Sequence, residues 1–319
     1  MFLVCGEALF DVFITGAGAA TSAEVLNLEA HPGGSPFNVA IGLARLGQPV
    51  SFLAGVSRDM LGDRLIAKLE AEGVATAPVQ RLAAPTTLGL VSLDARGLPE
   101  YAFYGDGAAD RRLDAAALPT LDTAIRAIHL GSYATVVDTT ASALEALVRR
   151  EHRQRLIAYD PNVRINVEPS LARWHARIDA LSPLVHLLKI SDEDLRLLYG
   201  ELSPGEFAGR MLERGVRLVV VTRGADGAVA WNARGCAETA GVPVPLQDTV
   251  GAGDTFQAAM LAWLAETGRL APDALAELGA AELEALLAYA ARAAAVTCSR
   301  RGADLPRKEE VGPARLPAA

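Results

Sequence analysis

Short apolar segments alternate along the chain with longer segments in which apolar residues recur every three or four positions. The short segments are typical of buried strands, and the longer ones of helices with one apolar face. The expected strands are residues 2–5, 51–54, 127–130, 156–159, 187–190 and 218–222. The expected helices are residues 36–46, 59–72, 139–150, 171–181, 192–199, 204–214, 251–265 and 283–297. This alternation predicts βαβ units and an α/β fold with a mostly parallel sheet.

The first expected helix carries recognisable signals at both ends. Ser35 stands at the N-cap position, Pro36 at the first helical position and Gly47 directly after the end. The proline-containing tail after Arg307 has no such signals, and we expect it to be loose.

Two stretches interrupt the α/β rhythm. Residues 12–31 have no helical stripe and are rich in glycine, threonine and alanine, whereas residues 86–104 alternate between apolar and polar side chains. Such alternation is typical of antiparallel strands with one wet face. We interpret both stretches as one small β-layer inserted over the carboxyl edge of the main sheet, where ligands of open α/β sheets bind.

This interpretation divides the chain into two parts. The expected body comprises residues 1–11, 35–84 and 113–319, and the expected β-lid comprises residues 12–34 and 85–112. The sequence has no internal repeat and no long linker.

Composition and charge exclude several classes of protein. Of the 319 residues, 51% are hydrophobic and 21% are charged, which is typical of a globular protein and not of a disordered one. No apolar run is long enough to span a membrane, and the N-terminus lacks the basic start of a signal peptide. The net charge of −8 argues against a partner that is nucleic acid or a membrane surface.

The cysteines indicate a reducing compartment. Cys5, Cys236 and Cys298 are odd in number and widely spaced, so they provide neither a disulfide framework nor a zinc site. We interpret them as buried free thiols and expect a cytoplasmic protein.

The strongest candidate for chemistry is the segment from Asp248 to Phe256, which opens a helix. Gly251, Ala252 and Gly253 can turn successive backbone N–H groups toward one point, where the helix dipole favours an anion such as phosphate. Asp254 falls in the first turn and can face the same point. The alternative is a tight turn followed by an ordinary helix-start acid, but two glycines and an acid at one terminus favour the anion site.

A second group of candidates lies near the first strand and the first helix. Gly33 and Gly34 allow a ligand to approach the backbone closely, and Asn38 offers an amide in the first helical turn. Asp11 lies just past the first strand, where a carboxylate can accept two neighbouring hydroxyl groups. The alternatives are a capped turn and an exposed loop acid.

Further polar residues follow three of the expected strands. Arg164 ends the turn of residues 160–164 and can reach a polar ligand. The residues that lie where nucleotide phosphates are expected, if the Gly251–Asp254 turn holds the transferred group, are Lys189, Asp194, Thr222, Arg223, Gly224 and Gly227. The acids among them would also suit ordinary helix starts.

Other well-known motifs are absent. Gly16-Ala-Gly18 follows no strand–helix unit of the dinucleotide-binding kind, and no Gly-Lys dipeptide exists for a Walker-type loop. No serine-hydrolase elbow or paired-histidine zinc motif is found. His129 and His186 lie in apolar runs and are interpreted as core residues.

Taken together, the two segments containing Gly33–Ala40 and Asp248–Phe256 resemble the two signatures of the ribokinase-like (PfkB-type) carbohydrate kinases. The resemblance extends from Gly6 to Pro306. It implies a three-layer α/β/α body with a mostly parallel central sheet and a small inserted β-lid. It also implies a small-molecule sugar substrate and a homodimer formed through the lid.

The resemblance assigns a role to each candidate. Asp254 would be the catalytic base, and Gly251, Ala252 and Gly253 the anion hole. The sugar would be held by Asp11, Gly33, Gly34, Asn38, Phe103 and Arg164. The phosphates of ATP would lie near Lys189, Asp194, Thr222, Arg223, Gly224 and Gly227, with Mg²⁺ brought by the nucleotide.

The family also predicts a cation site and shows where this chain departs from its pattern. Some members bind a monovalent cation such as K⁺ near the positions of Asp248 and Val250, with a contribution from the loop that contains Gly302. The phosphate-side motif often reads Asn-x-x-Glu, whereas here it begins at Ser191 and ends at Asp194. Ala291 stands where some members have an asparagine that contacts adenine.

The resemblance implies ATP-dependent phosphorylation of a sugar hydroxyl. The opening segment from Gly6 to Asp11 and the turn from Asp160 to Arg164 are most similar to the fructokinase branch. A 2-keto-3-deoxygluconate kinase is an alternative, with Arg164, Arg111 and Arg112 facing the carboxylate, and kinases of ribose or aminoimidazole riboside are further ones. A non-catalytic sugar-binding sensor would need an appended docking segment and would tolerate the loss of Asp254.

Overall fold

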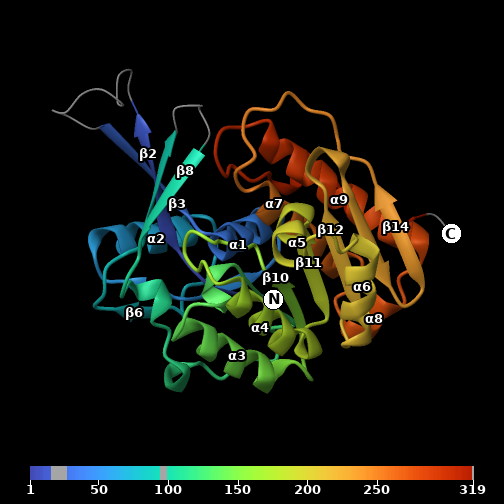
Figure 1. Cartoon of the computed structure of the whole chain (residues 1–319), viewed down its shortest axis with the longest axis horizontal. Helices are drawn as coiled ribbons and strands as arrows, with labels where there is room; N and C mark the ends of the chain where they lie inside the picture. Colours follow the sequence, from blue (N-terminus) through green and yellow to red (C-terminus); the bar gives the residue numbers. More distant parts are fainter. Residues whose placement is uncertain (16–26, 94–98, 318–319) are drawn as a thin grey trace.

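The computed structural model describes residues 1–15, 27–93 and 99–317. An eight-stranded sheet forms the centre of the molecule, and a four-stranded sheet projects from one of its edges (Figure 1). Part of the stretch expected to form the lid, including the Gly16–Gly18 segment, lies outside the described residues.

The main sheet has the strand order β14-β13-β12-β11-β10-β9-β1-β4. Its strands are β1 (Phe2–Cys5), β4 (Val50–Leu53), β9 (Ala127–Gly131), β10 (Leu156–Asp160), β11 (Leu187–Ser191), β12 (Leu218–Thr222), β13 (Ala228–Asn232) and β14 (Gly235–Thr239). The six strands from β12 to β4 are parallel, and β13 and β14 are added antiparallel at one edge. Parallel strands of this kind are covered on both faces, which explains their continuous apolar sequences.

Helices cover both faces of the main sheet and give a three-layer body. One apolar core is shared by α1 (Ser35–Arg45), α2 (Met60–Ala71), α7 (Ala252–Glu266), α8 (Pro272–Ala276) and α9 (Ala280–Cys298). The other is shared by α3 (Thr140–Glu151), α4 (Leu171–Leu181), α5 (Asp192–Tyr199) and α6 (Pro204–Glu213). The predicted α/β fold is therefore confirmed.

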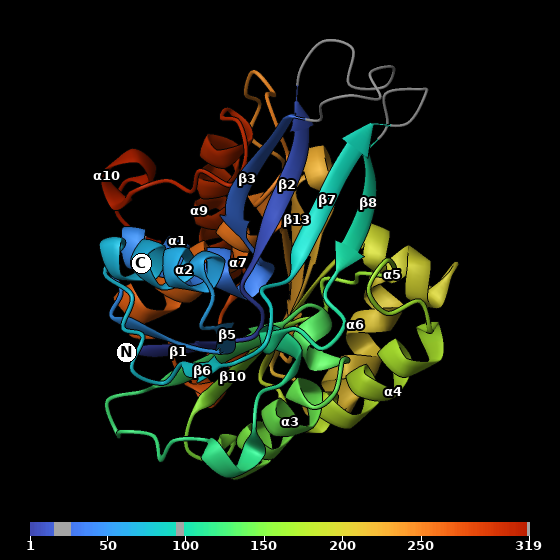
Figure 2. The same ribbon diagram turned by 90° about the vertical axis from the view of Figure 1, so that its left-hand side faces the viewer.

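The second sheet has the order β3-β2-β7-β8. Its strands are β2 (Leu9–Thr15), β3 (Asn27–Gly33), β7 (Leu88–Leu93) and β8 (Pro99–Tyr104). Strands β7 and β8 pair antiparallel, as their alternating sequence predicts, whereas β2 and β7 pair in parallel. Figure 2 shows this sheet rising from the body beside α1 and α7. Since β2 begins four residues after β1 ends, the second sheet starts at the carboxyl edge of the main one.

Several short elements complete the described chain. They are β5 (Gly55–Ser57), β6 (Gln80–Leu82), α10 (Lys308–Val311) and the 3₁₀ turns at Ala109–Arg111, Ala115–Ala117, Tyr133–Thr135, Ser182–Leu184 and Gly224–Asp226. No helix in the described ranges combines the length and the apolarity needed to cross a bilayer.

Three sequence-based expectations are wrong. Ser35 is not the N-cap of α1: Gly34 takes that position, and Ser35 is the first helical residue with its hydroxyl directed elsewhere. The tail after Arg307 is not loose over α10, because Val311 is buried and Glu310 accepts hydrogen bonds from both Arg307 and Arg300. Cys236 is exposed on the edge strand β14, and only Cys5 is fully buried among the three thiols.

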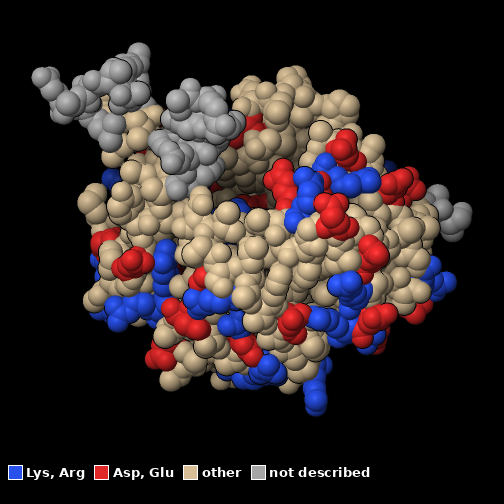
Figure 3. Space-filling view, viewed as in Figure 1, with Lys and Arg blue, Asp and Glu red and all other residues tan. Residues whose placement is uncertain are grey.

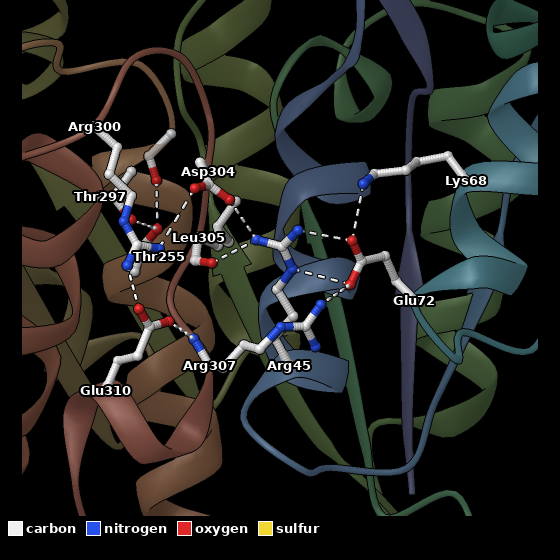
Figure 4. Close-up of polar contacts among 11 residues, drawn as sticks. Arg45, Lys68, Glu72, Thr255, Thr297, Arg300, Asp304, Leu305, Arg307 and Glu310 are labelled. Carbon is white, nitrogen blue, oxygen red and sulfur yellow. Dashed lines mark hydrogen bonds and ion pairs between the residues drawn. The ribbon is translucent and has the colours of Figure 1, made fainter.

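A network of ion pairs explains why the chain after α9 is held. Arg45, in the last turn of α1, pairs with Glu72 at 2.7 Å and with Asp304 at 2.8 Å, and it also donates to the carbonyl of Leu305 (Figure 4). Glu72 is itself shared with Lys68. The network therefore fastens the segment that follows α9 to both α1 and α2.

Candidate active site

Asp254 lies at the point where α7 meets α1. Its carboxylate accepts a hydrogen bond from the Ser35 hydroxyl at 2.7 Å and another from the Asn38 amide at 2.8 Å. Burial raises the pKa of Asp254, and these two hydrogen bonds oppose that effect. Both carboxylate oxygens are thus held by residues more than 200 positions away in the sequence, so the side chain is fixed in a largely dry place.

The turn before Asp254 has the backbone geometry expected of an anion site. Gly251 has a φ of 78°, in the left-handed region that favours glycine, and a Cβ there would lie 2.8 Å from the side chain of Ala303. The hydroxyl of Thr255 donates to the Gly251 carbonyl and is hydrogen-bonded to Thr297 on α9, each at 2.8 Å (Figure 4). The turn is therefore anchored on two sides, while Gly253 stays exposed.

A buried charged pair lies next to this turn. The ammonium of Lys189, in the middle of β11, is 2.5 Å from an oxygen of Asp160, the last residue of the neighbouring strand β10. The same ammonium is 3.6 Å from the position that a Cβ on Gly253 would occupy. The other oxygen of Asp160 is buried and has no hydrogen-bond partner among the described residues. Lys189 thus places a positive charge beside the glycine turn.

Asp194 completes this side of the site. It accepts a hydrogen bond from the Val163 backbone at 3.2 Å, and its pKa is raised by burial and by the negative charge of Asp160. Among the described residues, no cluster of three or more histidine, cysteine or acidic side chains is arranged to hold a metal. One unpartnered carboxylate oxygen beside a second carboxylate does, however, suit a hydrated Mg²⁺ that arrives with a nucleotide.

The residues expected to contact a sugar gather around Asp11 on β2. Asp11 pairs across the sheet with Gly89 on β7, and its carboxylate lies against Gly33, where any Cβ would clash with it. The ring of Phe103 packs beside Gly89 and meets Tyr133 edge-on at 6.4 Å between ring centroids. Burial, with a smaller contribution from the charge of Asp254, raises the pKa of Asp11 to about 6, although Arg164 opposes both effects.

Arg164 is the positively charged residue that affects several acids of this site at once. It lowers the pKa values of Asp11, Asp254 and Asp194, although burial outweighs it in each case. Its guanidinium donates to the Val163 carbonyl at 3.0 Å, within its own turn. Its charge therefore acts on all three acids from the segment that follows β10.

The structure brings the residues after β12 only partly toward the site. Thr222 is in register with Ser191, so it lies at the same edge of the main sheet as Lys189. Arg223 pairs with Glu238 on β14 at 3.2 Å, and Gly227 has a φ of 88° and packs against the carbonyl of Thr239. Since a Cβ at position 227 would clash with β14, packing within the β13–β14 region explains why this residue is glycine. Gly224, in contrast, is exposed to solvent.

The segments expected around a monovalent cation meet at Asp248. One of its oxygens accepts the N–H of Val250 at 3.0 Å, and the other accepts the N–H of Gly302 at 2.8 Å. Asp248 therefore joins the loop before α7 to the loop after α9. In the space-filling view, the molecule is hollowed near the upper edge of the body, and acidic and basic atoms appear inside the hollow (Figure 3).

The structure brings two further residues, Asp160 and Ser35, into the site. Asp160 directly follows the apolar run of residues 156–159, and this is the same signal in the sequence that marks Asp11. Ser35 precedes a proline, and that position in the sequence indicates only a helix cap. The contact of Ser35 with Asp254 spans 219 positions and leaves no local signal in the sequence.

Comparisons with known proteins agree with this geometry. Residues 1–310 match the model of the pfkB family carbohydrate kinases. A fructokinase from Rhizobium leguminosarum bv. trifolii is 36% identical over 264 residues, which are 83% of this chain and 79% of that protein. The crystal structure of a fructokinase from Xylella fastidiosa with bound ATP has a TM-score of 0.87 at 26% identity, and covers 97% of this chain and 96% of that one.

A further similar structure contains a sugar together with a nucleotide. It is a double mutant of the fructokinase from Vibrio cholerae O395, in a form with fructose, ADP and potassium ion bound. Its TM-score is 0.83 at 25% identity, with 97% of this chain and 96% of that chain covered.

Proposed function

The chain belongs to the pfkB family of carbohydrate kinases, and from this premise we propose that it is a fructokinase that transfers the γ-phosphoryl group of ATP to the 6-hydroxyl of fructose. The observation that carries the proposal is the buried carboxylate of Asp254, held by Ser35 and Asn38 directly beside the glycine turn. A proton acceptor and an anion site within one helical turn are what phosphoryl transfer to an alcohol requires.

One proton moves during the proposed phosphoryl transfer. Asp254 accepts the proton of the sugar hydroxyl, while the oxygen of that hydroxyl forms a bond to the γ-phosphorus of ATP. The bond from that phosphorus to the bridging oxygen breaks, and ADP leaves with the electron pair. The proton passes from Asp254 to solvent after the products depart. Because burial raises the pKa of Asp254, its carboxylate is a stronger base than an exposed aspartate.

The glycine turn and Lys189 stabilise the transferring group. The N–H groups of Gly251, Ala252 and Gly253 would donate to the γ-phosphoryl oxygens, and the Lys189 ammonium lies close enough to Gly253 to share that charge. Thr222, Gly224 and Asp194 would face the remaining phosphates.

Two cations complete the proposal. Mg²⁺, bound to the nucleotide, would neutralise charge on the β- and γ-phosphates, and Asp194 and Asp160 would hold its water ligands. K⁺ would be held near Asp248, Val250 and Gly302, whose contacts already join the two loops on either side.

We also propose that the second sheet is a lid. Its strands carry Asp11 and Phe103, so its closure would both complete the sugar site and exclude the water that could otherwise attack ATP. Residues 12–34 and 85–112 would form this lid and the remaining residues the body, with Asp11 on β2 at the boundary between the two.

The lid is expected to form a homodimer, since Leu28 and Tyr104 expose large side chains on it. Sedimentation velocity at micromolar concentration should give the mass of a dimer. A single monomeric species would contradict assembly through the lid.

The substrate is tested by measuring ATP consumption with fructose, 2-keto-3-deoxygluconate, ribose and aminoimidazole riboside in parallel. We expect fructose to give the highest kcat/KM. A chain that binds sugar but consumes no ATP with any of them would instead be a sugar-binding sensor.

Arg164→Gln distinguishes a neutral sugar from an acidic one. If the substrate is fructose, the variant loses one hydrogen bond to a hydroxyl and KM rises by roughly 2–10-fold. For a keto-acid sugar the loss of a charge-assisted partner of a carboxylate would lower kcat/KM by about 100-fold or more. The measurement is kcat/KM for both sugars with the wild type and the variant.

A further inference from the structure

Glu7 is a buried acid that the proposed mechanism does not use. It lies two residues after β1, which is the strand next to the edge strand β4 in the main sheet, and is 1% exposed. One of its carboxyl oxygens accepts the backbone N–H of Ser35 at 3.3 Å. Its other oxygen is buried without a hydrogen-bond partner in the described part of the chain. A carboxyl group is costly to bury in this way unless it serves a neighbour.

The neighbour that Glu7 serves is the start of α1. The first N–H groups of a helix have no partner within the helix and are usually satisfied by the side chain at the N-cap. Here the N-cap is Gly34, which has no side chain to offer, and its φ of 110° brings it against the Glu7 carbonyl. Glu7 therefore supplies, from 28 positions earlier, the acceptor that the helix lacks.

Ser35 is in turn the residue that holds Asp254. Its backbone N–H donates to Glu7, and its hydroxyl donates to Asp254 at 2.7 Å. Both the backbone and the side chain of Ser35 are therefore held by hydrogen bonds. If the Glu7 acceptor is removed, the Ser35 N–H loses the partner that the described structure gives it at this helix start.

Glu7 also contacts the loop after β9. The Ser132 side chain lies close enough to the Glu7 carboxyl to lower its pKa, against the larger effect of burial. Ser132 has a φ of 56°, rare for a residue with a side chain, and its N–H donates to the Asp160 carbonyl at 3.0 Å. Glu7 therefore lies between the helix that holds Asp254 and the loop that borders Asp160.

We propose that Glu7 is a positioning residue for phosphoryl transfer: its carboxyl oxygen fixes Ser35, and through Ser35 the orientation of Asp254. This inference rests on the proposed role of Asp254 as the base. Misplacement of a catalytic group by about 1 Å can lower a rate by roughly 100-fold. Because Glu7 is linked to Asp254 through Ser35 alone, loss of the Glu7 acceptor should lower kcat.

The charge state of Glu7 suggests which variant is conservative. Burial raises its pKa to about 8, with Asp110 raising it and Ser132 and Arg164 lowering it, so the group is largely neutral at pH 7. The carboxyl accepts from Ser35 in either state. Glutamine keeps both the acceptor and the neutral charge, whereas methionine has a similar length and no comparable acceptor.

The test compares Glu7→Gln with Glu7→Met at pH 7. We expect kcat of Glu7→Met to fall by roughly 10–100-fold with KM for ATP within about twofold, and Glu7→Gln to stay within about threefold of wild type. A matched control is Glu151→Met, because Glu151, the last residue of α3, is also a buried acid but pairs with Arg155, just before β10 and remote from the site. Its melting temperature should fall without a change in kcat.

Each outcome decides the matter. A wild-type kcat in Glu7→Met overturns the inference, and so does a loss of kcat of more than tenfold in Glu7→Gln. If Glu7→Met does not fold, the kcat of Glu7→Gln decides alone. Asp254→Asn measured alongside separates the two proposals. If Asp254→Asn still turns over, the proposed function fails, and if Asp254→Asn is inactive while Glu7→Met is fully active, only the role of Glu7 fails.

Discussion

Asp254→Asn is expected to lower kcat by about 10²–10⁴-fold, the range that general-base catalysis contributes. Asparagine cannot accept a proton from the sugar hydroxyl at neutral pH. Fructose and ATP should still bind within about tenfold of wild type, because Asp11, Gly33 and the glycine turn are unchanged. The measurement is kcat and both KM values on one purified variant.

The fold of this variant should be nearly unchanged. Asparagine is close to aspartate in shape, and its amide oxygen can still accept from the Ser35 hydroxyl. Asn38 can turn its own amide so that the oxygen faces the new NH₂ group. A variant with a much lower melting temperature and near-normal turnover would indicate that Asp254 is a structural residue and would falsify its role as the base.

The pH dependence provides an independent check of the same role. The base works in its ionised form, and burial raises the pKa of Asp254 above that of an exposed aspartate. In the wild type, kcat/KM should therefore fall as the pH decreases, and the fall should begin at a higher pH than an exposed aspartate would give. The residual activity of Asp254→Asn should lack this acid limb.

Lys189→Met is expected to damage both stability and catalysis. Without the ammonium, the carboxylate of Asp160 stays buried and unpaired, which costs about 3–5 kcal/mol in the free energy of unfolding. The loss of a positive charge beside Gly253 should lower kcat by roughly 10²–10³-fold. Urea unfolding and steady-state kinetics measure the two effects separately.

A double variant separates the two consequences. Adding Asp160→Asn to Lys189→Met removes the unpaired buried charge, so much of the lost stability should return. The rate should not recover with it, because the positive charge is still missing. If turnover returned together with stability, Lys189 would serve only to neutralise Asp160.

The sequence predicts the body of the fold well because its parallel strands are buried on both faces. The apolar runs at residues 127–130 and 218–222 lie within β9 and β12, each within one residue of the observed bounds. The β13–β14 hairpin escapes the same reasoning. Its second strand is largely exposed at the edge of the sheet, so no apolar run marks it.

The site is predictable to the extent that it is contiguous in the sequence. Gly251–Asp254 forms one turn, and its residue types alone indicate an anion beside an acid. The partners of that acid come from α1, and the acceptor for α1 comes from the end of β1. Such contacts depend on how helices pack over the sheet, and no local pattern in the chain encodes them.

The ion pairs of Arg45 have a consequence for how the molecule opens. The first turn of α1 touches Asp254, and its last turn is fastened to Asp304 and Leu305. Just before these, Ala303 packs against Gly251. Helix α1 and the segment after α9 thus contact each other, and each also contacts the catalytic turn. We therefore expect these two segments, whose linked residues Arg45 and Leu305 are 260 positions apart, to unfold together as one cooperative unit.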